Sequence, residues 1–176
     1  MHQSTGLRVA GGVLYRLDHI TRPLPHQPAV RKGPPVPIIF KSASLKVSAA
    51  AAWEIVERYM RNDIHVFSTA EKQRVEGPWR IITSGGAEYR ELNLTVDPQH
   101  MFASYTVPNV FDSTFHHASM RVFDTGDGGC RFEWITDVDS DTYEVDHTDL
   151  YDVLWADLVK VVETGQEAPW PASTAD

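Results

Sequence analysis

Histidines at positions 116 and 147 are the groups of this chain best suited to acid–base chemistry near neutral pH. Alternation along the strand-like run 116–123 points His116 inward and His117 outward. A group that titrates near neutrality suits enolisation and dehydration, because a proton must leave carbon and return to oxygen. The alternative interpretation of His116 is a hydrogen-bonded histidine that lines a binding cavity.

A second cluster lies on the helix predicted over 143–163. His147 falls on its apolar face, flanked one turn away on each side by Tyr143 and Tyr151, with Leu154 further along that face. A histidine and two tyrosine hydroxyls directed into a cavity could position and protonate a carbonyl oxygen. Tyrosine is equally a normal wall residue whose hydroxyl reaches solvent, so both interpretations stand.

Two strand arginines could hold an enolate or a carboxylate through charge-assisted hydrogen bonds. Arg80 follows a Gly-Pro-Trp turn, and an exposed strand arginine is the alternative interpretation for it. The alternating apolar residues of 92–96 place Arg90 on the inward face of its strand.

The elements that must position these groups form a simple series. Six of the eleven prolines lie in 23–37, so residues 1–41 are predicted to be an extended basic arm outside the main fold, with a short strand over 13–17. A strand over 44–47, a Ser48-capped helix over 49–61, a six-stranded antiparallel meander and the long final helix then follow. The meander strands are predicted at 69–75, 79–83, 88–96, 101–107, 116–123 and 130–138. This order indicates an α+β fold in which a curved sheet wraps the last helix and leaves a cavity between them.

This series resembles the helix-grip (START-like, Bet v 1-like, SRPBCC) superfamily, and within it the polyketide cyclase/dehydrase branch. The resemblance covers about residues 42–165, followed by a tail over 166–176. It rests on the helix that opens the domain, Gly86 followed five residues later by Glu91, and the segments 77–80, 104–107 and 127–134.

What the resemblance implies is a pocket for a hydrophobic small molecule between the sheet and the final helix. It places Glu91 in the pocket wall, in conflict with the inward Arg90, and a β-bulge would reconcile the two. It also implies wall positions for Tyr105 and Trp134. Val96 stands where aromatase/cyclase members carry a pocket arginine, which weakens direct transfer of their mechanism.

Charge and composition exclude several classes of function. The net charge of -8 is concentrated in 137–157, which holds eight acidic residues and no Lys or Arg, whereas 1–41 carries a local excess of +5. Without clustered basic residues the chain is a poor nucleic-acid binder, and no apolar run approaches a membrane span. The single Cys130 forbids an intrachain disulfide. The stretch 137–148 fails as an EF-hand loop, because its sixth position is not Gly and its twelfth is not Glu, so we predict no metal.

Two hypotheses follow. The first is a cytoplasmic, cofactor-free polyketide cyclase or dehydratase, with aromatase activity as one form of this chemistry, in which His116, His147, Arg80 and Glu91 act on a hydrophobic polycarbonyl molecule. The second is a non-catalytic carrier or sensor of a hydrophobic ligand. The basic arm suggests a partner for the acidic surface, in the same chain or in a homodimer, so deleting 1–41 should weaken stability or dimerisation in a salt-sensitive way.

Overall fold

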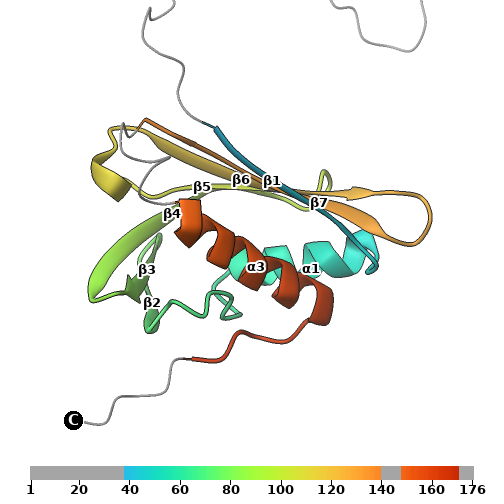
Figure 1. Cartoon of the computed structure of the whole chain (residues 1–176), viewed down its shortest axis with the longest axis horizontal. Helices are drawn as coiled ribbons and strands as arrows, with labels where there is room; N and C mark the ends of the chain where they lie inside the picture. The colour runs from blue at the N-terminus through green and yellow to red at the C-terminus, as the bar shows by residue number, and fades with distance from the viewer. Residues whose placement is uncertain (1–37, 140–147, 171–176) are drawn as a thin grey trace, which may run out of the picture. The chain divides into compact units, whose positions relative to one another are not determined.

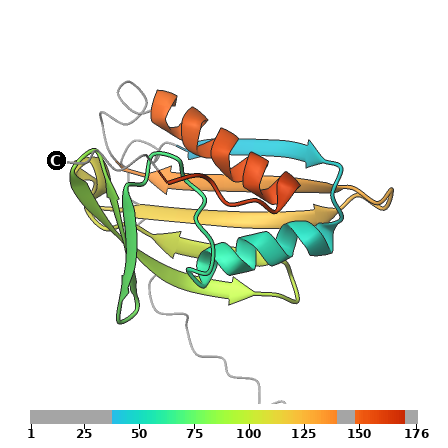
Figure 2. The same cartoon turned by 90° about the horizontal axis from the view of Figure 1, so that it is seen from below.

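The computed structural model describes residues 38–139 and 148–170. Its described part is a seven-stranded antiparallel sheet in the order β1-β7-β6-β5-β4-β3-β2, with two α-helices on one face (Figures 1 and 2). The α+β architecture predicted from the sequence is confirmed. The elements run β1 (Ile38–Leu45), α1 (Ala49–Met60), β2 (Lys72–Glu76), β3 (Trp79–Ser84), β4 (Ala87–Asp97), β5 (Phe102–Thr106), the 3-10 turn η1 (Val110–Asp112), β6 (His116–Asp124), β7 (Cys130–Val138) and α3 (Thr148–Thr164).

The first strand is longer than the sequence pattern indicated. It starts at Ile38 rather than near residue 44, and it pairs with β7 along its whole length. Residues 38–41, assigned above to the arm, therefore belong to the sheet, and Lys41 forms an ion pair with Asp152 of α3. The proposed strand over 13–17 lies outside the described residues.

Helix α1 begins where its cap predicted. The Ser48 hydroxyl accepts a hydrogen bond from the Ala51 amide at 3.2 Å, satisfying one free N–H of the first turn. Its apolar face, with Val56 and Met60 fully buried, packs against the sheet beside α3. Helix α3 contributes Leu158 and Val161 to the same core. Among the described helices none is long and apolar enough to span a membrane.

Strand β4 bends at a β-bulge between Asn93 and Thr95. Upstream of the bulge Glu91 faces the interior and is 3% exposed, while Leu94 on the other side is 50% exposed. Leu92 and Leu94 therefore lie on the outer face of the sheet, and only Val96, beyond the bulge, pairs with the inward Ala103. The predicted inward position of Arg90 is wrong for this reason.

The segment after α3 folds back onto the body. Gly165, at φ 68°, ends the helix in the left-handed conformation and its amide donates to the Val161 carbonyl at 2.8 Å. The chain then reaches His65: the amide of Ala168 donates to the His65 carbonyl at 3.0 Å, and the rings of Trp170 and His65 stack 3.5 Å apart. Residues 166–170 are thus part of the packed domain.

Candidate functional site

An internal cavity of about 110 Å³ lies between the inner face of the sheet and α3. Six of its fifteen lining side chains are aromatic and three others are large aliphatic residues, so its wall is mainly apolar. Its ionisable members are Glu91, His116 and three tyrosines, at positions 89, 105 and 151. Apolar surroundings strengthen electrostatic interactions and oppose charge, so these few groups dominate what the cavity can do chemically.

His116 opens β6 and is 6% exposed in the cavity wall. The amide of Val107 donates to its Nδ1 at 3.1 Å, which assigns the ring proton to Nε2 in the neutral form. Burial, with a smaller contribution from His117, lowers the pKa of His116 from 6.5 to about 4. The expected titration near neutrality is therefore wrong, and His116 is a neutral ring with an N–H donor.

Glu91 extends from β4 into the cavity wall, and its carboxylate is hydrogen-bonded to two residues of the fold. Arg80, its cross-strand neighbour on β3, donates to Oε1, and the Tyr59 hydroxyl donates to Oε2 at 3.3 Å. Burial raises the pKa of Glu91 above its ordinary 4.5, against the opposing effect of Arg80 and the two hydrogen bonds. A buried carboxyl with a raised pKa exchanges its proton closer to neutral pH than an exposed one.

Arg80 itself fastens helix α1 to the sheet. Its Nη1 donates to the Tyr59 carbonyl at 2.6 Å, and its guanidinium carbon lies 3.7 Å from the centre of the Tyr59 ring. The side-chain amide of Asn93 donates to the next carbonyl, that of Met60. Carbonyls at a helix C-terminus lack intrahelical partners, so these two side chains supply a cap from the sheet. Arg80 is buried behind Glu91 and is not among the lining residues of the cavity.

Four other candidate residues lie in the cavity wall. Tyr105 accepts a hydrogen bond at its hydroxyl from Trp134 Nε1 at 3.1 Å, and burial raises the pKa of Tyr105 well above 10. The ring of Tyr151 stacks on that of Trp134 at 5.2 Å between centroids. Leu154 completes the α3 side. Tyr105 is therefore a protonated hydrogen-bonding group at neutral pH.

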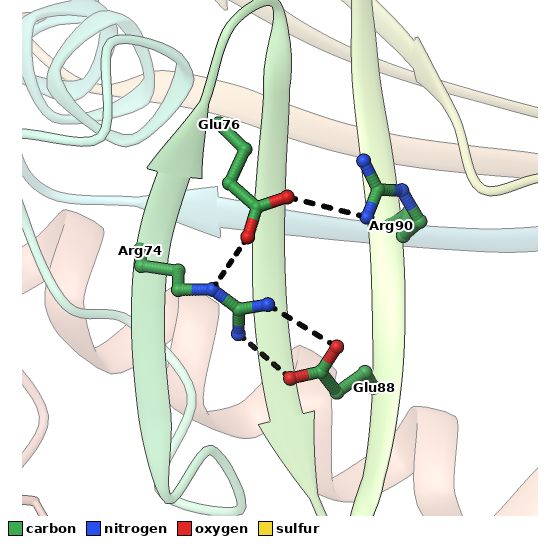
Figure 3. Close-up of polar contacts among 4 residues, drawn as sticks. All are labelled: Arg74, Glu76, Glu88 and Arg90. Carbon is green, nitrogen blue, oxygen red and sulfur yellow. Dashed lines mark hydrogen bonds and ion pairs between the residues drawn. The ribbon is translucent and has the colours of Figure 1, made fainter.

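Arg90 lies on the opposite face of the sheet from Glu91. There it belongs to an exposed ladder of four charges, with Arg74 bound to both Glu76 and Glu88 (Figure 3). Arg90 contributes one longer contact, 3.4 Å to Glu76. An inward substrate-binding role for Arg90 is therefore wrong.

Two candidates, His147 and Tyr143, lie outside the described residues, so their roles stay predictions. The structure also adds wall residues that the sequence analysis did not select: Phe67 from the loop after α1, Tyr89 from β4, and Val110 and Phe111 from η1. Phe111 sits in an irregular loop with no periodicity to reveal its direction. Tyr89 shares the inward parity of Glu91, which could have identified it.

The described residues contain no group of three or more His, Cys, Asp or Glu side chains placed to hold a metal ion. The acidic segment is partly engaged within the fold. Asp157 of α3 accepts two hydrogen bonds from Ser68, from its amide at 2.8 Å and its hydroxyl at 2.7 Å. Together with the Lys41–Asp152 pair, these contacts connect α3 to β1 and to the loop after α1.

Comparison with solved structures places this architecture among the Bet v 1-like helix-grip folds. The protein XoxI from Bacillus cereus superposes with a TM-score of 0.60 at 12% identity, covering 73% of this chain and 94% of that one. Norcoclaurine synthase from Thalictrum flavum, in complex with dopamine and hydroxybenzaldehyde, gives a TM-score of 0.58 at 16% identity and covers 75% and 89%. A protein from Thermobifida fusca gives 0.57 at 20% identity, covering 75% and 97%.

No protein-family model matches the chain, and no curated protein matches it by sequence. At these identities the structural likeness establishes the helix-grip fold. Function must be argued from the site itself.

Proposed function

We propose that this protein is a cofactor-free enzyme that uses its internal cavity to enolise a small carbonyl compound and drive aldol cyclisation and dehydration, the chemistry of a polyketide cyclase/dehydratase. The observation that carries the proposal is that Glu91, a buried carboxyl with a raised pKa, and His116, a neutral N–H donor, line one mainly apolar cavity. These are a proton acceptor and an oxyanion donor, the two groups that enolisation needs.

The roles follow from the hydrogen bonds. In its ionised form Glu91 takes a proton from the carbon beside a carbonyl, and His116 Nε2–H donates to the oxygen that gains charge. The enolate carbon then adds to a second carbonyl of the same molecule, and Glu91 returns the proton to the new alkoxide. Loss of water proceeds when Glu91 takes a second α-proton and then gives this same proton to the hydroxyl group, which departs as water while the C=C bond forms. Arg80 and Tyr59 hold Glu91 in place throughout.

The size of the cavity limits the substrate. Small-molecule sites commonly measure about 300–1,000 Å³, and an engineered apolar cavity of about 150 Å³ holds benzene. At about 110 Å³ this cavity suits a single ring or a short chain folded to ring size, rather than a long polycarbonyl chain. The norcoclaurine synthase structure holds dopamine and hydroxybenzaldehyde, each with one ring, which supports a ligand of this size for the shared fold.

The test uses heptane-2,6-dione, a short dicarbonyl chain that cyclises to 3-methylcyclohex-2-enone with loss of one water. We expect the protein to accelerate this conversion, followed by enone absorbance and by product mass. Glu91→Gln should lower kcat by about 100-fold or more, the usual contribution of a general base. His116→Leu, which has no N–H group, should lower kcat by about 100-fold through loss of the oxyanion donor. Arg74→Gln is the matched control on the outer face. Wild-type rates in both cavity variants, each shown to be folded, would refute the proposal.

A second candidate function is carriage or sensing of a small apolar ligand. It is favoured by the predominantly apolar wall and by the partners that Glu91 and His116 already have, since both are hydrogen-bonded within the fold. Saturable binding with the ligand recovered chemically unchanged, and insensitive to Glu91→Gln, would select this function instead.

A further inference from the structure

A gap in the sheet lies directly beside the cavity. Strand β5 ends at Thr106, opposite Leu92 of β4, so residues 87–91 of β4 pair with β3 only. Beyond Thr106 the chain continues as the loop from Val107 to η1, which lines the cavity together with Tyr89 and Glu91 of β4. At this position a loop, rather than a paired strand, stands beside β4 in the cavity wall.

A groove of about 360 Å³ lies on the outer side of this same loop. It shares four wall residues with the internal cavity: Tyr89, Val107, Val110 and Phe111. Cavity and groove therefore adjoin each other at these four side chains. The groove adds Trp79, Glu88 and Arg90, which do not line the cavity.

The dividing loop has an unusual backbone. Asn109, Phe111 and Asp112 have positive φ values of 60°, 53° and 56°, which side-chain-bearing residues seldom adopt. Hydrogen bonds hold both ends of the loop. At its start the Val107 amide donates to Nδ1 of His116. At its end Thr114 and Phe115 donate three hydrogen bonds to the Asp139 carboxylate. Strained backbone held between fixed ends is typical of segments with a second accessible conformation.

Arg90 has the fewer hydrogen bonds of the two arginines in the exposed ladder, and it lines the groove together with Glu88. Glu88 is held by both Nη atoms of Arg74, at 2.7 and 3.2 Å, and Arg74 also binds Glu76 at 2.9 Å. Within residues 38–139 and 148–170, Arg90 makes one side-chain hydrogen bond, at 3.4 Å to the same Glu76 (Figure 3). A guanidinium has five N–H donors, so Arg90 retains donors for a further acceptor.

We propose that the complete ligand site spans both compartments: an apolar ring occupies the cavity, a linker crosses the wall where Phe111 lies, and an anionic end group binds Arg90 in the outer groove beside Trp79. The ligand class is then an aryl or cyclic carbonyl compound with a carboxylate or similar anion at the end of a short chain. This inference rests on the ligand-binding part of the proposed function and requires no turnover. It gives Arg90 a binding role on the outer face, where the structure places it.

The test measures affinities of a series from phenylacetate to phenylbutanoate, each compared with its neutral primary amide. At the chain length that spans the wall, the wild type should bind the carboxylate about 5-fold tighter than the amide, as expected for one partly exposed charge pair. Arg90→Gln should bring that ratio to about one and leave amide affinity unchanged. Arg74→Gln, altered in the same ladder but outside the groove lining, should keep the ratio.

The wall is tested by kinetics. Phe111→Ala should raise the association rate of the phenylbutanamide probe several-fold, with Phe111→Leu as the variant that preserves packing and gives a smaller increase. A carboxylate preference that survives Arg90→Gln, or that is absent at every chain length, would overturn the anion assignment. Unchanged association rates in both Phe111 variants would overturn the proposal that the ligand crosses the wall at Phe111. Binding that follows these expectations without turnover of heptane-2,6-dione would refute the proposed enzyme but leave this inference standing.

Discussion

Strand β4 contributes a glutamate to an Arg–Glu pair on each face of the sheet, Glu91 with Arg80 of β3 inside and Glu88 with Arg74 of β2 outside. On the inner face Arg80 and Glu91 are 2% and 3% exposed, and burial raises the pKa of Glu91. On the outer face the guanidinium of Arg74 lowers the pKa of Glu88, which remains in contact with water. Two glutamates of one strand, each paired with an arginine, therefore differ in the direction of their pKa shift because only the inner pair has lost its hydration.

This contrast assigns the two pairs different roles. Removing water from two charges is expensive, and their attraction repays that cost only with good geometry and further hydrogen bonds, which Tyr59 supplies here. On the outer face Ile81 is the cross-strand neighbour of both Arg74 and Arg90. Its exposed fraction is nevertheless 0%, because the outer ladder of charged side chains covers it. The aliphatic stems of the ladder thus shield an apolar side chain, while the inner pair places a reactive carboxyl in the cavity.

The largest effect is expected from breaking the inner pair. Glu91→Leu leaves Arg80 buried without a counter-charge and should lower the free energy of unfolding by about 3–5 kcal/mol. The double variant Arg80→Met/Glu91→Leu should lose much less than the sum of its single variants, because no unpaired charge remains. Chemical denaturation of all four proteins measures this coupling. If the loss of unfolding free energy in the double variant equals the sum of the two single-variant losses, the inner pair does not act as a unit.

His116 should give the next largest effect, as a pH dependence. Its folded pKa of about 4 lies below the ordinary 6.5, so the unfolded chain takes up a proton that the folded chain refuses. The stabilisation is fully present above pH 6.5 and is lost as pH falls towards 4, about 3 kcal/mol in all. Glu91 acts in the opposite sense, because a raised carboxyl pKa favours the fold at the acidic end.

The contribution of His116 to the pH dependence of stability is isolated by comparing the wild type with His116→Gln. The amide oxygen of this variant can still accept the hydrogen bond from the Val107 amide. Denaturation between pH 4 and pH 7 should show the difference in stability between the two proteins changing across this range. A constant difference would contradict the assigned shift.

Strand and helix patterns predicted this fold because its elements have clear periodicity. Alternation also identified His116 as inward, and the apolar face of the final helix identified Tyr151 and Leu154. The alternation of 92–96 gave a wrong inward direction for Arg90. A bulge on β4 reverses which residues point inward on its two sides, and Leu94 lies on the outer surface. A bulge is set by pairing with β5 and leaves no local signal in this stretch.

The chemistry of His116 was not predictable for a related reason. Its pKa depends on burial and on the Val107 amide, and both arise from where a loop without periodicity lies. Arg80 as the partner of Glu91 also required the β3–β4 register, which the turn at 84–87 fixes only once the strands pair. Local sequence thus identified reactive residue types, while tertiary contacts set their charge state.

A smaller effect on stability is expected from the stacked rings of His65 and Trp170, of which only His65 is buried. His65 is 3% exposed, whereas the Trp170 ring that stacks on it, 8° from parallel, is 47% exposed. Trp170→Ala should lower the free energy of unfolding by about 1 kcal/mol, the range of an aromatic pair. Trp170→Phe should restore part of this loss. Equal stability of all three proteins in thermal denaturation would show that the returning segment contributes nothing.

The smallest effect on stability should come from the outer ladder, although its electrostatic signature should be clear. Arg74→Gln should shift the melting temperature by less than about 2 °C, because exposed ion pairs are weak. It should nevertheless raise the pKa of Glu88 towards 4.5, since Arg74 is the main cause of the lowered value. Added salt should have the same effect on Glu88 in the wild type and leave the pKa of Glu91 nearly unchanged, because screening acts on exposed charges. Carboxyl NMR titration of both glutamates measures this, and an equal response to salt would mean that the two faces do not differ in hydration.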